Sequence, residues 1–287
     1  MELRVFTDLE DPELRSAWAR LEDAGACPHV FASYPWVSVW GRQFAAGGGP
    51  LALVGYSDST PVGLAPLFAK DGVASFPVNF LSPRGGLLLS GAAHHDAFAA
   101  ACLGLLHERG LRPLLRGLPV RSASFSLLER HARGAGYYVA VRPGRIAQHL
   151  DVTTTWEEFL VTLPKTRTGK WARQIRRLER EGKVILRGVE DVTDMDDLVT
   201  RFADLEARSW KERAGTSIRG RGLEAFYGEL CRSLRDAGSL RPYWIEVNGR
   251  MIAFLLGALY RGHYAAMKTS YDEEHARELG TAIRASY

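Results

Sequence analysis

Three apolar segments follow one another towards the end of the chain, at residues 240–247, 251–260 and 263–271. Asn248-Gly249 stands in the first gap between them and Arg261-Gly262 in the second. An Asn-Gly pair between two apolar runs is the strongest short-range signal for a β-hairpin, because both residues tolerate the left-handed backbone of a tight turn. The pattern predicts three consecutive antiparallel strands, and this meander restricts the fold more than any other part of the sequence.

The rest of the chain alternates between helical and strand patterns. Apolar residues at helical spacing, together with a capping box that starts at Thr155, predict helices at 11–23, 35–45, 96–109, 122–135, from 155 onwards, 165–181, 194–210 and 223–235. Shorter apolar runs predict strands at 3–6, 76–81, 113–118, 137–141, 147–152 and 184–189, and a hairpin that turns at residues 58–61. The predicted fold class is α/β (α+β), with mixed, mostly antiparallel sheets flanked by helices.

A chain of 287 residues is long enough for two domains. Pro143-Gly144-Arg145 marks the predicted boundary, which gives one lobe of residues 1–145 and a second of residues 146–287. Residues 51–68 and 242–260 both read as a strand, a tight turn and an apolar run that contains a small residue. This internal echo suggests that the two lobes are related copies of one fold.

Composition excludes several classes of protein. Hydrophobic residues make up 46% and charged residues 24%, which is ordinary globular composition, and no apolar run reaches 18 residues. The first residues carry mixed charge and do not resemble a secretory signal. The three cysteines are far apart, which favours a reducing compartment over a disulfide framework, and the histidines lack metal-ligand spacing. We therefore expect a cytoplasmic, soluble protein without a bound metal.

The net charge of +4 is unevenly distributed, because residues 165–183 hold eight basic residues and two glutamates. One interpretation is a surface helix that buries Trp171, Ile175 and Leu178 and exposes its charges to solvent. The other is a shelf for an anionic acceptor, such as a phosphorylated or lipid-pyrophosphate-linked sugar. Nucleic acid is a third interpretation, but no aromatic stacking platform accompanies the charge.

A short motif directly follows the last predicted strand of the meander: Arg277-Glu-Leu-Gly280-Thr-Ala282 fits R/Q-x-x-G-x-G/A. Gly280 permits a tight turn and a close approach of the backbone to a ligand. The amides of Leu279 to Ala282 are the unpaired donors of a helix start, and together they form a cradle for a pyrophosphate. The alternative is that Gly280 only lets a loop enter a helix.

The meander followed by Thr269-Ser-Tyr-Asp-Glu-Glu-His-Ala-Arg-Glu-Leu-Gly-Thr-Ala-Ile283 resembles motif A of the GNAT acyltransferase superfamily. The wider pattern resembles the CelD-like acetyltransferases, which have two GNAT-like lobes and are related to the Fem peptidoglycan-bridge enzymes. The matching segments are Phe31-x-x-x-x-Trp36, Gly63-Leu-Ala-Pro66-Leu, the basic run Lys170–Gly182, Ser209-Trp210, Asn248-Gly-Arg-Met-Ile-Ala253 and Tyr271-Asp272. They are spread in order over nearly the whole chain.

The resemblance implies an N-acyltransferase that moves an acetyl or other acyl group from acyl-CoA to an amine. The implied acceptor is a small molecule or a lipid- or nucleotide-linked sugar, as in an amino sugar or a cell-envelope or polysaccharide precursor. It also implies work in the cytoplasm, peripheral to the inner membrane, and needs no metal. The competing hypothesis is an inactive protein of the same fold that holds an anionic partner on helix 165–183.

Candidate site residues follow from the same resemblance. Glu246 and Asp272 are the candidate proton acceptors, although Glu246 also reads as a solvent-facing strand residue and Asp272 as a turn former. Lys268, Thr269, Ser270, Arg277, Leu279, Gly280, Thr281 and Ala282 are the candidate coenzyme A contacts. Lys170, Arg173, Arg177 and Trp210 are the candidate acceptor contacts.

The chain departs from the family pattern in three places. Leu279-Gly280 stands where this branch usually has Pro-Gly, so the cradle is expected to be less rigid. The sequence ends at Tyr287, inside the helix that should follow the cradle, which predicts an incomplete second lobe. The first lobe lacks the motif, and Arg84-Gly85-Gly86 is its nearest substitute. We therefore expect the first lobe to be degenerate and to bind no coenzyme A.

Overall fold

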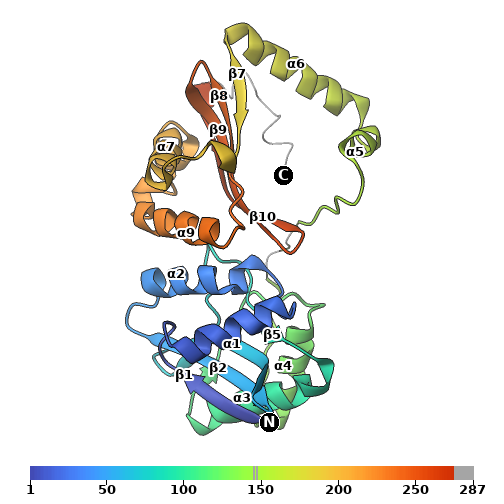
Figure 1. Ribbon diagram of the computed structural model, residues 1–287, viewed down its shortest axis with the longest axis vertical. Helices are drawn as coiled ribbons and strands as arrows, with labels where there is room; N and C mark the ends of the chain where they lie inside the picture. Colours follow the sequence, from blue (N-terminus) through green and yellow to red (C-terminus); the bar gives the residue numbers. More distant parts are fainter. Residues whose placement is uncertain (145, 147, 275–287) are drawn as a thin grey trace. The chain divides into compact units, whose positions relative to one another are not determined.

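The computed structural model describes residues 1–144, 146 and 148–274 of the chain. Packing divides these residues into two units. The first unit comprises Met1–Gly144 together with Ser233–Gly238 and Leu259–His263, and the second takes in the rest of the described chain. Each unit contains one β-sheet with helices beside it (Figure 1).

The first unit is built on a six-stranded sheet with the order β1-β2-β3-β4-β6, in which β5 also pairs with β3. Its strands are β1 (Glu2–Phe6), β2 (Gly49–Ser57), β3 (Thr60–Lys70), β4 (Val73–Ser75), β5 (Leu88–Leu89) and β6 (Arg112–Pro113). Its helices are α1 (Pro12–Asp23), α2 (Tyr34–Phe44), α3 (His95–Glu108) and α4 (Ala123–Gly134), with short 3₁₀ turns at Val30–Ala32 and Ala92–His94.

Glycine on two neighbouring strands allows α3 to lie close to this sheet. Gly55 of β2 pairs with Gly63 of β3. A Cβ atom added at either position would lie 2.6 Å from the ring of Phe98, which is fully buried. The ring of Phe98 therefore occupies the space that a side chain at Gly55 or Gly63 would need. It belongs to a hydrophobic core that includes Leu103 and Leu106 of the same helix.

The second unit is built on a four-stranded sheet with the order β10-β9-β8-β7. Its strands are β7 (Val184–Arg187), β8 (Tyr243–Val247), β9 (Arg250–Tyr260) and β10 (His263–Tyr271). Its helices are α5 (Trp156–Thr162), α6 (Lys165–Glu181), α7 (Met195–Ala207), α8 (Trp210–Arg213) and α9 (Glu224–Asp236), with 3₁₀ turns at Val189–Asp191 and Arg219–Arg221. Part of α9 and the tip of the β9–β10 hairpin are assigned to the first unit.

Helices α6 and α7 cover opposite faces of this second sheet, as Figure 1 also shows. Leu178 of α6 packs against Val247 and Ile252 on one face. On the other face the ring of Phe202 from α7 stacks on Phe254 of β9, with ring centroids 4.0 Å apart. Side chains alternate along a strand, so Trp244 and Glu246 of β8 point towards α7 while Val247 points towards α6.

The predicted fold class and the predicted meander are confirmed. Asn248 and Gly249 both have positive φ angles, as do Arg261 and Gly262, so each pair forms the expected tight turn. The capping box is also present: the hydroxyl of Thr155 accepts from the Glu158 amide, and the Glu158 carboxylate accepts from the Thr155 amide.

Several predicted boundaries are wrong. Residues 76–81 form no strand, because Pro77 cannot donate to a ladder and the Asn79 side chain accepts from the amides of Leu81 and Ser82 to make a turn. Residues 114–118, 137–141 and the described part of 147–152 also lack strand structure. The predicted helix 194–210 is two helices, because the hydroxyl of Ser209 accepts from the Lys211 amide and begins α8. Among the described helices, none is long and apolar enough to cross a membrane.

Candidate functional site

Several buried polar side chains of the second unit gather between α7 and the strands β8, β9 and β10. Asp194 starts α7 by accepting a hydrogen bond from the Asp196 amide. Leu198, Phe202 and Glu206 then follow at intervals of four residues, so they lie on one side of the helix. The first two are apolar and pack in the core, and the third brings a carboxylate to the same buried face.

Glu206 is fully buried and holds two lysine side chains. Its Oε1 lies 3.0 Å from Nζ of Lys211 on α8, and its Oε2 lies 3.1 Å from Nζ of Lys268 on β10. The amide of Ile218 donates to Oε2 at 2.8 Å. Lys211 also donates to the carbonyl of Thr269, which ties α8 directly to the backbone of β10. One carboxylate therefore joins α7, α8 and β10 through charge-assisted hydrogen bonds.

The ammonium group of Lys268 lies in an unusual environment. Its side chain is only 9% exposed, and Nζ lies 5.5 Å from the ring centroid of Tyr227 on α9. Burial lowers the pKa of Lys268 below the usual 10.5; the charge of Glu206 opposes this change, and the charge of Lys211 adds to it. The formal charges of Glu206, Lys211 and Lys268 sum to +1.

Ser270 follows Lys268 on the same side of β10, because side chains alternate along a strand. Its residue is buried, and its hydroxyl has no hydrogen-bond partner among the described residues. A buried hydroxyl without a partner is uncommon in folded proteins.

Asp272 follows immediately after β10 and is held by two arginines. Its Oδ2 accepts from Nε of Arg208 at 2.9 Å and lies 2.7 Å from Nη2 of Arg250. Its Oδ1 accepts from the Glu274 amide at 3.1 Å. Burial raises the pKa of Asp272, but the hydrogen bond from Arg208, the Glu274 amide and the charge of Arg250 outweigh burial and hold the pKa below 3.8. The end of β10 is thus fixed by an ionised carboxylate.

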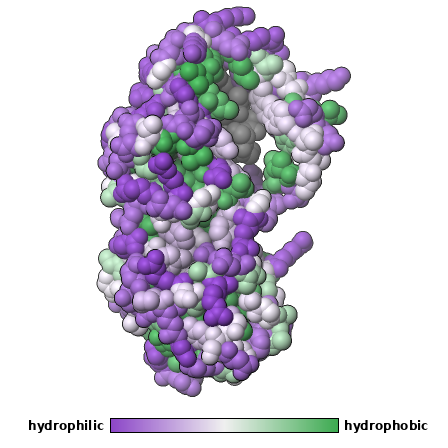
Figure 2. Space-filling model, viewed as in Figure 1, coloured by the Kyte–Doolittle hydropathy of each residue, from purple (hydrophilic) through white to green (hydrophobic). Residues whose placement is uncertain are grey.

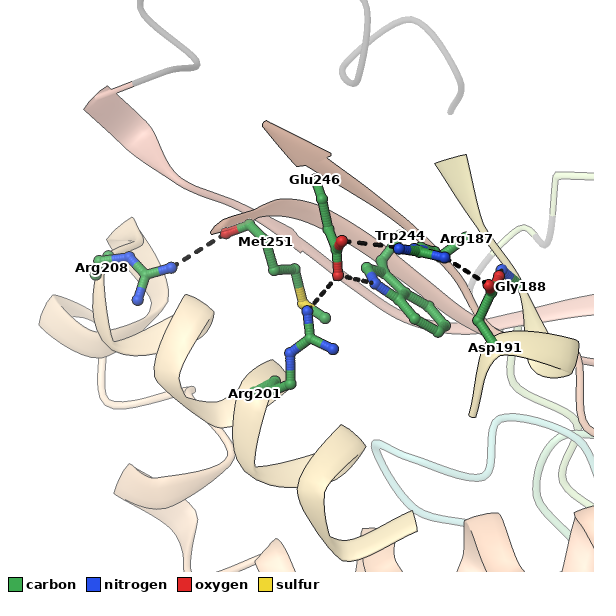
Figure 3. A network of polar contacts seen from close by, with 8 residues as sticks. All are labelled: Arg187, Gly188, Asp191, Arg201, Arg208, Trp244, Glu246 and Met251. Carbon is green, nitrogen blue, oxygen red and sulfur yellow. Dashed lines mark hydrogen bonds and ion pairs between the residues drawn. The ribbon is translucent and has the colours of Figure 1, made fainter. Parts of the chain in front are cut away.

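Glu246 on β8 occupies the centre of a third network, drawn in Figure 3. Its Oε1 accepts from Nε1 of Trp244 at 2.9 Å and from Arg201 on α7, and its Oε2 lies 3.5 Å from Nε of Arg187 on β7. Arg187 in turn pairs with Asp191 at 2.8 Å. Burial raises the pKa of Glu246. The hydrogen bonds from Arg201 and Trp244 and the charges of Arg201 and Arg187 outweigh this effect, so the pKa lies below 4.5.

The interpretation of Glu246 as a solvent-facing residue is wrong, because only 6% of the residue is exposed. Asp272 does cap the turn that follows β10, and it is also buried at 2% exposure. A general base works best with a pKa near the working pH. As proton acceptors the two carboxylates therefore stay a prediction, and their lowered pKa values argue for a positioning role.

The remaining predicted site residues lie in different parts of the second unit. Lys268, Thr269 and Ser270 all belong to β10 and adjoin the Glu206 network. Arg277, Leu279, Gly280, Thr281 and Ala282 lie outside the described residues. Lys170, Arg173 and Arg177 are exposed on α6, and Trp210 is partly exposed at the start of α8. Ile175 was expected to be buried and is 53% exposed, because it lies at the edge of the face that carries Leu178.

Glu206 and Lys211 were not among the predicted site residues. The signal was present: Glu206 continues the i, i+4 series of Leu198 and Phe202, so a carboxylate stands in the apolar stripe of α7. A charged residue at such a position needs a buried partner of opposite charge. In the part of the chain that the structure describes, no group of three or more His, Cys, Asp or Glu side chains is placed to hold a metal ion.

Comparison with known proteins finds a family match in the C-terminal part of the chain. Residues 165–282 match the family described as acetyltransferase (GNAT) domain. A solved structure of FemX is 10% identical and has a TM-score of 0.62, with 100% of this chain and 84% of that chain covered. A tandem GNAT protein from the clavulanic acid biosynthesis pathway is 14% identical with a TM-score of 0.42, over 97% of this chain and 82% of that one. No curated protein sequence matches the chain.

Proposed function

We propose that the chain transfers an acyl group from acyl-CoA to an amine, because residues 165–282 belong to the acetyltransferase (GNAT) superfamily. The family match carries this proposal, since it spans both the β8–β10 meander and the motif Arg277–Ala282. The acceptor that we propose is an amino sugar or another precursor of the cell envelope or of a polysaccharide, on the basis of the resemblance to CelD-like and Fem enzymes. We further propose that residues 146–287 bind the acyl-CoA and that residues 1–145 are a degenerate lobe without that function.

In this reaction the acceptor nitrogen bonds to the thioester carbonyl carbon and loses a proton, the C–S bond breaks, and the thiolate of coenzyme A takes up a proton. The protein must orient both substrates and supply an N–H group to the oxyanion. Backbone amides of residues 268–272 are our candidates for that donor. The amides of Leu279 to Ala282 are our candidates for the pyrophosphate contact.

The networks around β10 support this proposal physically. The Thr269 carbonyl is held by Lys211, and Asp272 is held by Arg208 and Arg250. A strand that supplies an oxyanion donor must keep its amides in place within about 0.5 Å. The bonds to Thr269 and Asp272 restrict movement of β10. They favour a role for Glu206 and Asp272 in positioning the backbone of this strand.

The substitution Gly280→Glu tests the proposed coenzyme A contact, because it places a carboxylate where the pyrophosphate would lie. We expect acetyl-CoA affinity to fall at least about 100-fold in isothermal titration calorimetry, since like charges repel at close range. Gly104→Glu is the matched control: a Cβ atom there meets no atom within 4 Å, and the residue lies on α3 of the first unit. Unchanged affinity in the Gly280 variant would remove the proposed contact.

A second candidate function is an inactive protein of this fold that binds a polyanion on α6. The observation in its favour is that all seven basic residues of α6 are exposed. Binding to heparin that weakens steeply with salt, in a protein that takes up no acetyl-CoA, would favour this candidate over the enzyme.

A further inference from the structure

An exposed apolar segment immediately precedes α6. Among the described residues between 146 and 161, five large hydrophobic side chains are between 59 and 94% exposed. They are Ile146, Leu150, Val152, Trp156 and Val161. Single exposed apolar residues are normal, but five within 16 residues form a concentration that folded proteins usually keep for contact with a partner or a membrane.

Helix α6 adds a row of positive charge next to this segment. Lys165, Arg173, Arg176 and Arg180 lie on the side of the helix opposite the buried Gln174 and Leu178, because each residue advances 100° around the axis. All four are exposed, and no ion pair to them is found among the described residues. At 1.5 Å per residue the row extends over about 22 Å.

The apolar segment and the basic row belong to the same unit and are joined through α5 and Pro164. Figure 2 shows hydrophilic surface over α6 and hydrophobic atoms over α5 beside it. We propose that Ile146, residues 148–165 and the outer face of α6 dock the protein on an anionic lipid bilayer. In this arrangement Trp156 and Val161 enter the interface between headgroups and acyl chains, and the row of α6 contacts lipid phosphates.

Each of the two features alone is compatible with other partners, and their combination favours lipid. A nucleic acid would use the positive row, but four of the five apolar side chains are aliphatic and only Trp156 offers a ring on which a base could stack. A second copy of the chain would cover the apolar segment, but it would place two positive rows of the same sign close together. An anionic bilayer supplies both apolar depth and negative charge, and tryptophan is enriched at such interfaces. This inference does not depend on acyl transfer.

Co-sedimentation of the purified full chain with lipid vesicles tests the proposal. We expect binding to phosphatidylcholine vesicles that contain about 30% phosphatidylglycerol and none to pure phosphatidylcholine vesicles, because the row needs anionic lipid. Each basic residue near an anionic surface contributes roughly fivefold to binding. The variant K165E/R173E/R176E/R180E should therefore bind at least about 100-fold more weakly. The control R109E/R112E/R116E/R121E changes charge equally on exposed residues of the first unit and should bind within about threefold of the native chain.

A second variant tests the apolar part. W156S/V161S should retain binding in low salt and lose it at about 0.5 M salt, where charge is screened and only apolar insertion remains. Three results would overturn the proposal: no binding to anionic vesicles, equal loss in both charge-reversed variants, or tighter binding to a single-stranded oligonucleotide at the same phosphate concentration. Dimerisation that W156S/V161S abolishes, without vesicle binding, would assign the apolar segment to a second copy.

Discussion

Replacement of Glu206 by glutamine removes the carboxylate that two buried lysines share. Gln has nearly the same shape as Glu, so packing around α7 should change little. The variant leaves the ammonium groups of Lys211 and Lys268 at 17 and 9% side-chain exposure without a negative partner. Loss of one partner from a buried ion pair costs about 3–5 kcal/mol, because the remaining charge is left uncompensated. We expect the free energy of unfolding to fall by that amount.

The corresponding change in melting temperature is large enough to measure. For a protein of about 150–250 residues, 1 kcal/mol shifts the midpoint by roughly 2–4 °C, so Glu206→Gln should lower it by about 6–20 °C. Asp204→Asn is the control. It removes a carboxylate that lies about half a turn earlier on α7 and forms an exposed ion pair with Arg219. Exposed pairs contribute about 1 kcal/mol or less.

Calorimetry measures the midpoint, and hydrogen exchange of peptides covering 200–220 locates the loss. The glutamine variant should also recover stability as the pH rises, because a lysine without its carboxylate can lose its proton more easily. If Glu206→Gln and Asp204→Asn shift the midpoint equally, the buried network does not stabilise this unit and the reasoning fails.

Three further predictions concern the same unit. Burial lowers the pKa of Lys268, so the unfolded chain binds more protons than the folded chain as the pH approaches 10.5. The free energy of unfolding should therefore rise with pH in this range. Urea titrations at several pH values should show this rise in the native chain and not in Lys268→Met. The pKa of Asp272 is held below 3.8, so its contribution to stability is present above that pH and is lost as the pH falls further. Asp272→Asn should lower the free energy of unfolding by about 1–2 kcal/mol near pH 7, and the two proteins should become equally stable in acid. Phe254→Ala should cost about 3–5 kcal/mol in thermal unfolding because it removes a stacked, buried ring, whereas Tyr138→Ala, at a position that is 95% exposed, should leave the midpoint unchanged.

Local signals in the sequence predicted the local parts of this structure. The turn at Asn248-Gly249 needs only two residues with left-handed backbone, and the cap at Thr155 needs only four consecutive residues. Strand propensity alone was a weaker guide: residues 137–141 have the composition of a strand, yet Tyr138 is almost fully exposed and no described strand pairs with the segment. A strand requires a neighbour, and the sequence does not show where the neighbours are.

The ion networks could not be predicted in the same way, because their members come from distant parts of the chain. Arg208 and Asp272 are 64 residues apart, and Arg201 and Glu246 are 45 apart. An aspartate after a strand has the same sequence pattern whether it caps a turn or pairs with two arginines. Only the packing of α7 against the sheet decides between these outcomes.

Two of the buried carboxylates, Glu206 and Asp272, share one physical consequence, which concerns the register of β10. In the described sheet β10 pairs on one side only, with β9. Apolar packing is not directional and tolerates a shift along the strand, whereas an ion pair requires particular atoms at particular positions. A slip of one residue would carry Lys268 and Asp272 to the opposite face, so Glu206 would lose its bond to Lys268 and Arg208 its bond to Asp272. The networks therefore make a shifted β10 more costly than packing alone would, and a fixed register is what a backbone oxyanion donor on this strand would require.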